Sequence, residues 1–279
     1  MRIDSHQHFW RASRGDYGWL TPDLGSLYRD YLPDDLRPLL QEHRIDKTVV
    51  VQAAPTVAET DFLLALAQQH EFIAGVVGWL DMARVDFEEQ FAAYRRKPGF
   101  IGIRPMLQDL PEDDYILKPQ VLDSLGKITA ADFPFDFLVY TRHLPYVLRA
   151  LERAPALRAV IDHIAKPEIR ARLMEPWKSL TRELAQYPNV YCKLSGMITE
   201  ADQKNWKADD LRPYVEHVAE CFGPQRLMFG SDWPVCLLAG TYSQVINALA
   251  ETLTPMLDEA AMARVFGENA ARFYKCSDS

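Results

Sequence analysis

The segment Lys47–Ala53, KTVVVQA, decides the fold. Three consecutive valines make both faces of this extended segment apolar, and β-branched residues favour strands. Strands that are apolar on both faces are typical of parallel sheets covered by helices on both sides. The same pattern recurs in IAGVVGW (Ile73–Trp79) and in RAVIDH (Arg158–His163). The sequence therefore predicts an α/β fold built on a parallel sheet.

Eight strand-like runs are spread along the chain. They are Arg2–His8, Lys47–Ala53, Ile73–Trp79, Phe100–Met106, Pro134–Tyr140, Arg158–His163, Val190–Ser195 and Leu227–Asp232. Segments with helical apolar spacing, such as Asp61–His70, separate them. Eight such units in 279 residues predict a (β/α)₈ TIM-type barrel that fills residues 1–279 as a single domain. A doubly wound open sheet is the alternative, although no G-x-G-x-x-G motif follows the first strand.

The amino-acid composition indicates which binding partners and which cellular compartment to expect. The chain has 31 Lys and Arg against 39 Asp and Glu, a formal net charge of −8, so we expect no nucleic-acid partner. No apolar run reaches the length of a membrane span, so we expect no membrane partner either. Four widely spaced cysteines and the absence of an apolar leader predict a cytoplasmic protein. A homo-oligomer remains open.

His6 and His8 end the first strand-like run. Alternation places both side chains on one face, and the carboxyl ends of barrel strands form active sites. Asp232 ends the eighth run, which neighbours the first in a closed barrel. This trio could bind a metal ion, or Asp232 could act as a general base. The structural alternative is that the histidines bond to loop carbonyls and that Asp232 caps a turn before Pro234.

Further candidates end other strands. Three roles are open for His163, namely a third metal ligand, a donor to a substrate carbonyl and a buried structural histidine. Strand alternation predicts that the side chain of Asp162 lies on the face opposite His163. Arg104, inside an apolar run, suits a polyhydroxyl or carboxylate ligand, or an ion pair at the barrel mouth. Side chains at or just beyond strand ends complete a predicted substrate-binding set: Trp10, Gln52, Arg104, Tyr140, Lys166 and Trp233.

Two long segments and the remaining histidines complete the picture. Residues 11–30 and 107–129 are rich in aromatic, acidic, Gly and Pro residues, so we expect them to cover the barrel mouth. His43, His70 and His217 fall in helical segments, where we expect solvated faces.

Several motifs resemble the amidohydrolase superfamily, in particular its lactonase branch of sugar lactonases and 2-pyrone-4,6-dicarboxylate lactonase. The matching segments are IDSHQHFW (Ile3–Trp10), GIRPML (Gly102–Leu107), VIDHIAKP (Val160–Pro167), LSGM (Leu194–Met197), FGSDWPV (Phe229–Val235) and FGENAARFY (Phe266–Tyr274). They occur in order along nearly the whole chain. Within the branch, the bacterial L-fucono- and L-rhamnono-lactonases are the nearest match. The resemblance implies a distorted barrel that hydrolyses a cyclic ester.

The resemblance also implies a ligand set. His6 and His8 match the first-strand pair, His163 the strand-6 histidine and Asp232 the strand-8 aspartate. Strand 4 offers Arg104 where members with two metals carry a bridging Lys or Glu, and strand 5 ends without a histidine. The implied cofactor is therefore one Zn²⁺ or another divalent ion. Because the branch includes metal-independent lactonases, catalysis without a metal also stays open.

The resulting hypothesis is hydrolysis of a sugar lactone, L-fucono-lactone or a similar aldonolactone. In this hypothesis Asp232 deprotonates the attacking water. The lactone carbonyl is polarised either by zinc or by the histidines, His163 among them, and Arg104 holds the sugar hydroxyls. The alternatives are a decarboxylase of the same superfamily, a lactonase for a pyrone- or muconate-type carboxylated lactone, and a sugar-binding barrel without catalysis.

Overall fold

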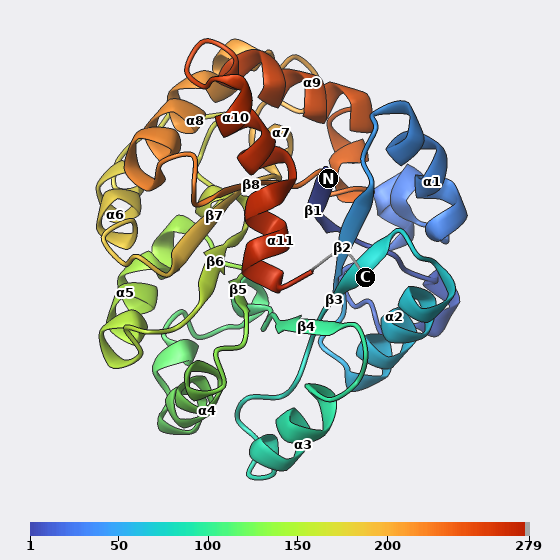
Figure 1. Ribbon diagram of the computed structural model, residues 1–279, viewed down its shortest axis with the longest axis vertical. Coiled ribbons are helices and arrows are strands. Elements are labelled where there is room, and N and C mark those ends of the chain that lie inside the picture. The colour runs from blue at the N-terminus through green and yellow to red at the C-terminus, as the bar shows by residue number, and fades with distance from the viewer. Residues whose placement is uncertain (277–279) are drawn as a thin grey trace.

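The computed structural model describes residues 1–276, and its centre is a ring of eight parallel strands (Figure 1). The strands are β1 (Ile3–Gln7), β2 (Lys47–Val51), β3 (Ile73–Gly78), β4 (Phe100–Ile103), β5 (Phe135–Phe137), β6 (Ala159–Ile161), β7 (Val190–Leu194) and β8 (Leu227–Phe229). Each strand pairs with the next one in the sequence. A parallel bridge between Gln7 and Trp233 joins the two ends of the ring. The predicted barrel is therefore confirmed, and the open doubly wound sheet is excluded.

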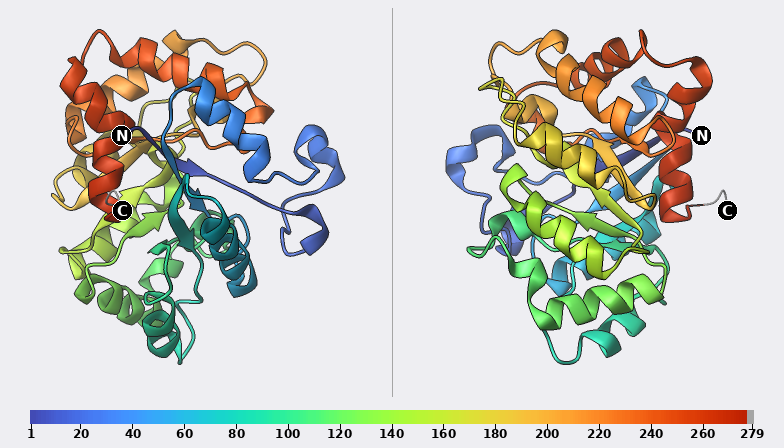
Figure 2. Two further views of the ribbon diagram at one scale, coloured as in Figure 1. Left: turned by 45° about the vertical axis from the view of Figure 1, so that its right-hand side comes forward. Right: turned by 90° about the vertical axis from the view of Figure 1, so that its left-hand side faces the viewer.

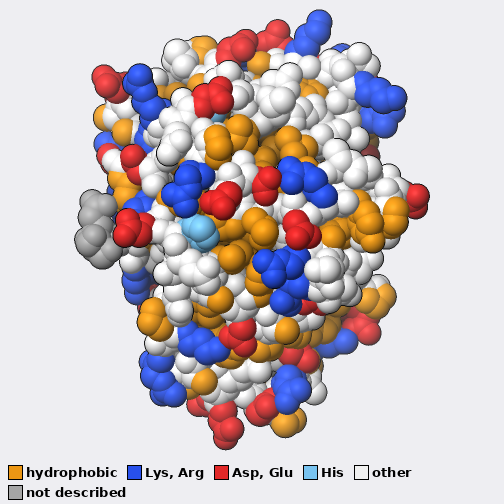
Figure 3. All heavy atoms as spheres, turned by 90° about the vertical axis from the view of Figure 1, so that its right-hand side faces the viewer, with side chains coloured by type: hydrophobic (Ala, Val, Ile, Leu, Met, Phe, Trp, Pro, Cys, Tyr) orange, Lys and Arg blue, Asp and Glu red, His pale blue; other side chains and the backbone are white. Residues whose placement is uncertain are grey.

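Helices surround the ring (Figures 1 and 2). They are α1 (Pro33–Glu42), α2 (Val57–Gln69), α3 (Phe87–Tyr94), α4 (Pro119–Ala130), α5 (Leu144–Arg153), α6 (Trp177–Leu184), α7 (Met197–Glu200), α8 (Ala208–Phe222), α9 (Tyr242–Leu253), α10 (Glu259–Ala263) and α11 (Asn269–Tyr274). No helix within residues 1–276 combines the length and apolar character that a bilayer crossing needs. On the face drawn in Figure 3, basic side chains alternate with acidic ones.

Apolar side chains fill the barrel below its carboxyl end. Ile3, Val49, Val160 and Met228 belong to one fully buried cluster, although they come from strands on different sides of the ring. Helix α11 adds Phe273 to this cluster and lies across the amino-terminal end of the barrel (Figure 1). The filled and covered end leaves the carboxyl ends of the strands as the place for a site.

Strand β1 is irregular where it approaches that end. Its register with β2 shifts between Asp4 and Gln7. Ile3 lies in the interior cluster, and His6, three positions later, also faces the interior among Asp162, Lys193 and Asp232. Strict alternation would send Ile3 and His6 to opposite faces, so the register shift is what allows both to point inward.

Residues 11–30 leave the barrel as an excursion beyond the end of β1 (Figure 2). The backbones of Trp10 and Tyr31 bond to each other at its base. The ring of Trp10 packs edge-on against Trp19 and Tyr31. These contacts fix the start and the end of the excursion, which supplies one wall of the pocket described next.

Candidate active site

A pocket of about 200 Å³ opens at the carboxyl ends of the strands. Both long segments contribute to its wall, Trp19 and Leu24 from the first and Gln108 and Asp109 from the second. Its lining comprises His8, Trp19, Leu24, Ala53, Arg104, Met106, Gln108, Asp109, Leu138, His163, Lys166, Asp232, Val235 and Leu238. The lining thus combines apolar side chains with imidazole, carboxylate, ammonium and guanidinium groups.

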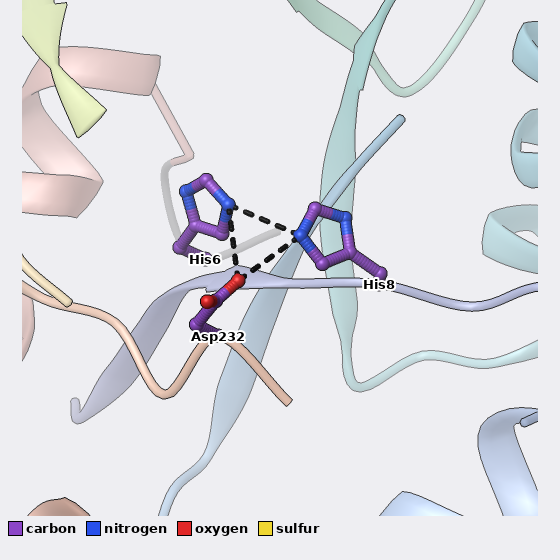
Figure 4. Close-up of side chains that lie close together, drawn as sticks. All are labelled: His6, His8 and Asp232. Atoms are coloured by element: carbon purple, nitrogen blue, oxygen red, sulfur yellow. Dashed lines mark hydrogen bonds and ion pairs between the residues drawn. The ribbon is translucent and has the colours of Figure 1, made fainter. Parts of the chain in front are cut away.

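His6, His8 and Asp232 converge at this pocket (Figure 4). The Nε2 atoms of the two histidines lie 3.3 Å apart. Oδ1 of Asp232 lies 3.3 Å from Nε2 of His8 and 3.8 Å from Nε2 of His6. All three side chains are almost completely buried. Closure between β1 and β8 brings them together, because the Asp232 backbone N–H donates to the His6 carbonyl.

Hydrogen bonding fixes the protonation of His8. Its Nδ1 lies 2.7 Å from the carbonyl oxygen of Val51. A carbonyl only accepts, so Nδ1 carries a proton and donates it to Val51, and this bond turns Nε2 toward the other two groups. Nδ1 of His6 lies 3.3 Å from an Asp162 oxygen and 3.2 Å from Nζ of Lys193. Both tautomers of His6 therefore find a partner at Nδ1.

The donor set suits one tetrahedral divalent metal ion. Nitrogen and oxygen ligands about 2.0–2.2 Å from a tetrahedral zinc are separated by about 3.3–3.6 Å. The three ligand atoms of His6, His8 and Asp232 are 3.3 to 3.8 Å apart. Nε2 of His163 lies 3.9 Å from the same Asp232 oxygen but falls outside this close group of three ligand atoms. The residues present therefore fit a metal ion without rearrangement of the backbone.

A left-handed turn places His163. The chain leaves β6 with positive φ angles of 53° at His163 and 48° at both Ile164 and Lys166. Nδ1 of His163 lies 2.9 Å from the Ser195 hydroxyl. A Cβ atom on Gly196 would lie 2.6 Å from this same Nδ1, so only glycine fits at that position. The turn aims the other ring nitrogen of His163 at Asp232.

The same turn corrects the prediction for Asp162. Alternation predicted its side chain on the face opposite His163, and that prediction is wrong. Asp162 is fully buried inside the barrel, 3.3 Å from both His6 and Arg104. The strand ends at Ile161, so strand alternation no longer applies to the two residues that follow it.

A network of buried charges lies beneath the histidines. Lys193 contacts Asp136 at 2.5 Å and Asp162 at 3.0 Å, and all three side chains are fully buried. The hydroxyl of Tyr274 in α11 donates to Asp136 at 2.7 Å. Burial raises the pKa of Asp136 to about 6, against the opposing effect of Lys193. The network links the helix at the closed end of the barrel to His6.

Burial and nearby charge set the ionisation of the site. Burial holds the pKa values of His6 and His163 well below their usual range, which keeps both imidazoles neutral. Burial alone would raise the pKa of Asp232, but His163, His8 and Lys166 together lower it. Near neutral pH the site therefore holds the Asp232 carboxylate beside neutral imidazoles at His6 and His163, and metal ligation requires such ionised carboxylates and neutral histidines.

The remaining predicted residues occupy different places. Lys166 and Arg104 line the pocket, and Tyr140 lies at its edge, with the Lys166 ammonium 5.2 Å from its ring. Trp10 and Trp233 are buried outside the lining and pack against the ring of Tyr31.

Gln52 is fully buried and donates to the Arg104 carbonyl. The main-chain carbonyl of Gln52 accepts a hydrogen bond from the Arg104 guanidinium. Gln52 therefore supports Arg104 from below the pocket.

Two features escaped the sequence reasoning. Trp19, which the predicted substrate-binding set left out, is the tryptophan in the pocket lining. His217 was expected on a solvated face but is 3% exposed, and it donates to the Lys178 carbonyl. That expectation is wrong because α6 covers this side of α8, with Trp177 packed against His217.

Comparison with known proteins identifies the family. A family model described as amidohydrolase matches residues 3–276. The chain belongs to this amidohydrolase family. A curated L-fucono-1,5-lactonase of Burkholderia ambifaria is 46% identical to this amidohydrolase over 99% of the chain and 96% of the relative. A second, of Burkholderia multivorans, is 40% identical over 98% of the chain and 96% of the relative.

A solved structure matches nearly the whole chain. It is an amidohydrolase from Burkholderia multivorans with bound zinc, 40% identical, with a TM-score of 0.93 and coverage of 99% of each chain. The fold of this amidohydrolase therefore has a close counterpart among proteins of known structure.

Proposed function

We propose that this amidohydrolase opens a sugar lactone, with L-fucono-1,5-lactone as the preferred substrate. The observation that carries the proposal is the convergence of His6, His8 and Asp232 in the pocket of a chain 46% identical to a curated L-fucono-1,5-lactonase. Opening the ring adds the hydroxyl of water to the carbonyl carbon, and the ring oxygen leaves as an alcohol. The product is the aldonic acid.

His6, His8 and Asp232 would hold one zinc ion, with His163 as a fourth ligand. A bound zinc would polarise the lactone carbonyl and make water more acidic. The zinc-bound structure of the Burkholderia multivorans protein supports the choice of metal. His8 keeps its Nδ1 proton on Val51 throughout, which holds the orientation of its ring.

Asp232 would act as the general base and then as the general acid. Its lowered pKa keeps it ionised at neutral pH and able to take a proton from water. It would return that proton to the ring oxygen as the C–O bond breaks. Its position in the pocket lining beside His8 and His163 supports this role in proton transfer.

Substrate contacts divide between polar and apolar residues of the pocket. Lys166 and Arg104 would bind the hydroxyl and carbonyl oxygens, with Tyr140 at the rim. Trp10, Gln52 and Trp233 would act by supporting these residues rather than by touching the sugar. The apolar residues of the lining, Leu24, Leu138, Val235 and Leu238, would suit the methyl group that a 6-deoxy sugar carries in place of a hydroxymethyl group.

The charge of the lining favours a neutral substrate over a carboxylated lactone. Lys166 and Arg104 are its two cations, and Asp109 and Asp232 its two carboxylates. Arg104 already contacts Asp162. The side chains of this pocket would therefore offer a dicarboxylate no surplus of positive charge beyond that of the bound zinc.

The test combines metal analysis with a panel of substrates followed by a pH indicator. We expect about one zinc per chain and the fastest hydrolysis with L-fucono-1,5-lactone among 1,5- and 1,4-aldonolactones. Absence of hydrolysis across the panel would overturn the proposal. Release of CO₂ from hydroxybenzoates, or faster hydrolysis of 2-pyrone-4,6-dicarboxylate, would select one of the two alternatives.

A further inference from the structure

A second cavity adjoins the reaction pocket. Its volume is about 560 Å³, larger than the pocket itself. Trp19, Met106 and Asp109 line both spaces, so the two spaces adjoin at these side chains. The cavity lies over the carboxyl ends of β2, β3 and β4, between the two long segments. We refer to it as the side cavity.

Aromatic side chains dominate part of the wall of the side cavity. Trp79 and Tyr115 are half-buried and line this cavity together with Trp19. The indole N–H of Trp19 donates to the Ala53 carbonyl. Within residues 1–276, the indole N–H of Trp79 has no partner, and its ring pairs with no other aromatic ring. Trp79 therefore lines the cavity with a half-buried indole whose N–H donates to no group within the described residues.

Carboxylates provide the polar part of the wall. Asp16 is paired with Arg14 at 2.7 Å, whereas Asp81 and Asp109 form no ion pair in the described part of the chain. Lys and Arg do not occur in this lining, as far as residues 1–276 show. The wall would therefore repel anions and accept hydrogen bonds from hydroxyl groups.

We propose that the side cavity is a subsite for a neutral sugar unit attached to the lactone. Aromatic faces stack on the C–H faces of sugars, while carboxylates accept hydrogen bonds from sugar hydroxyls. The reaction pocket accommodates the lactone ring, and the shared wall of Trp19 and Met106 leads from it into the side cavity. The enzyme would thus open glycosyl-substituted aldonolactones as well as simple ones.

This inference rests on the proposed lactone hydrolysis and adds no new bond chemistry. Water adds to the carbonyl carbon, the ring C–O bond breaks, and the glycosidic bond stays intact. The product is an aldonic acid that still carries its sugar. The reaction that supplies such a substrate is the oxidation of a reducing-end sugar at its C1.

The kinetic test compares L-fucono-1,5-lactone with derivatives that carry a β-glucosyl group on O2, O3 or O4. We expect at least one derivative to have a KM at least fivefold below that of the parent. In Trp79→Ala this advantage should fall below twofold, while kcat/KM for the parent stays within twofold of wild type. Tyr28→Ala is the control, because Tyr28 is exposed and lines neither cavity.

Charge provides a second arm. A glucuronyl derivative should bind more weakly than its glucosyl counterpart, and Asp81→Asn should narrow that difference. Preference for the glucuronyl derivative would contradict the proposal. An equal loss on parent and derivative in Trp79→Ala would also overturn it, since that result indicates a structural role.

A binding arm separates this proposal from the proposed function. Saturation-transfer NMR with methyl β-glucoside should show contact with the wild-type protein and a signal reduced at least threefold in Trp79→Ala. If the parent lactone is not hydrolysed, the proposed function fails. The NMR binding measurement still shows whether the side cavity binds a sugar. Absence of a signal in wild type, or no glucosyl derivative better than the parent, overturns the subsite.

Discussion

Nζ of Lys193 lies 3.2 Å from Nδ1 of His6, within a fully buried group that also holds Asp136 and Asp162. Removing one partner of a buried ion pair leaves an uncompensated charge and costs roughly 3–5 kcal/mol. We expect Lys193→Met to lower the free energy of unfolding by about that amount in chemical denaturation. The exposed pair of Lys97 with Asp61 is the control, and Lys97→Met should cost at most about 1 kcal/mol. Equal costs for the two variants would contradict the importance of the buried network.

Asp232→Asn removes the proposed base and keeps the shape of the side chain. We expect kcat to fall by about 10²–10⁴-fold, the usual contribution of general acid–base catalysis. Circular dichroism should show an unchanged fold, since the Asp232 backbone bond to His6 remains. A kcat within tenfold of wild type would remove Asp232 from the proposed role.

His8→Ala tests the metal site through binding rather than turnover. Loss of one of the proposed ligands should weaken zinc affinity at least about 100-fold, measured by titration against a chromophoric chelator. His70→Ala, a histidine outside the pocket that bonds to Arg37, should leave the affinity unchanged. If His8→Ala binds zinc as tightly as wild type, the ion is held by other residues.

Gly230 marks a point where β8 and β1 approach closely. A Cβ atom there would lie 2.6 Å from Cβ of His6. Gly230→Ala should therefore displace His6, cost roughly 1–3 kcal/mol of stability and lower kcat at least tenfold. Gly126→Ala in α4, where a Cβ meets nothing within 4 Å, should be neutral or stabilising. Wild-type activity in Gly230→Ala would show that the strands can separate without harm.

Glu59 predicts a pH dependence of stability. Burial raises its pKa to about 8 from an ordinary 4.5, although the backbone N–H groups of Ala54 and Ala53 oppose that shift. The folded protein then holds a proton that the unfolded chain has lost, so stability falls as pH rises from about 4.5 to about 8. Replacement by Gln removes this titration. The Tm of Glu59→Gln should change less between pH 5 and pH 8 than that of wild type, and parallel Tm profiles would contradict this reading.

Strand periodicity predicted the positions of residues up to the end of each strand. The apolar runs located the barrel, and strand-end positions located His6, His8, His163 and Asp232 together. Beyond the strands the period no longer applies, which is why Asp162 was assigned to the wrong face. Four successive positive φ values between His163 and Lys166 turn the chain there, and no apolar pattern reports such a turn.

The tryptophans show a second limit. Trp10, Trp19 and Trp233 all follow strands or lie in long segments, so sequence position alone does not separate them. The packing of residues 11–30 decides which ring faces the pocket. Trp10 is fully buried against Tyr31, and Trp19 becomes part of the wall. Long-segment packing depends on tertiary contacts that spacing along the chain does not encode.

The bridge between Gln7 and Trp233 has a consequence for how the protein refolds. It pairs residues separated by almost the whole chain, so its formation carries a large loop-closure entropy and belongs to the slow class of non-local contacts. His8 and Asp232 flank this bridge and meet only when it forms. The return of hydrolytic activity during refolding therefore reports the closure of the ring. We expect activity to return no earlier than the slowest refolding phase that is detected by spectroscopy.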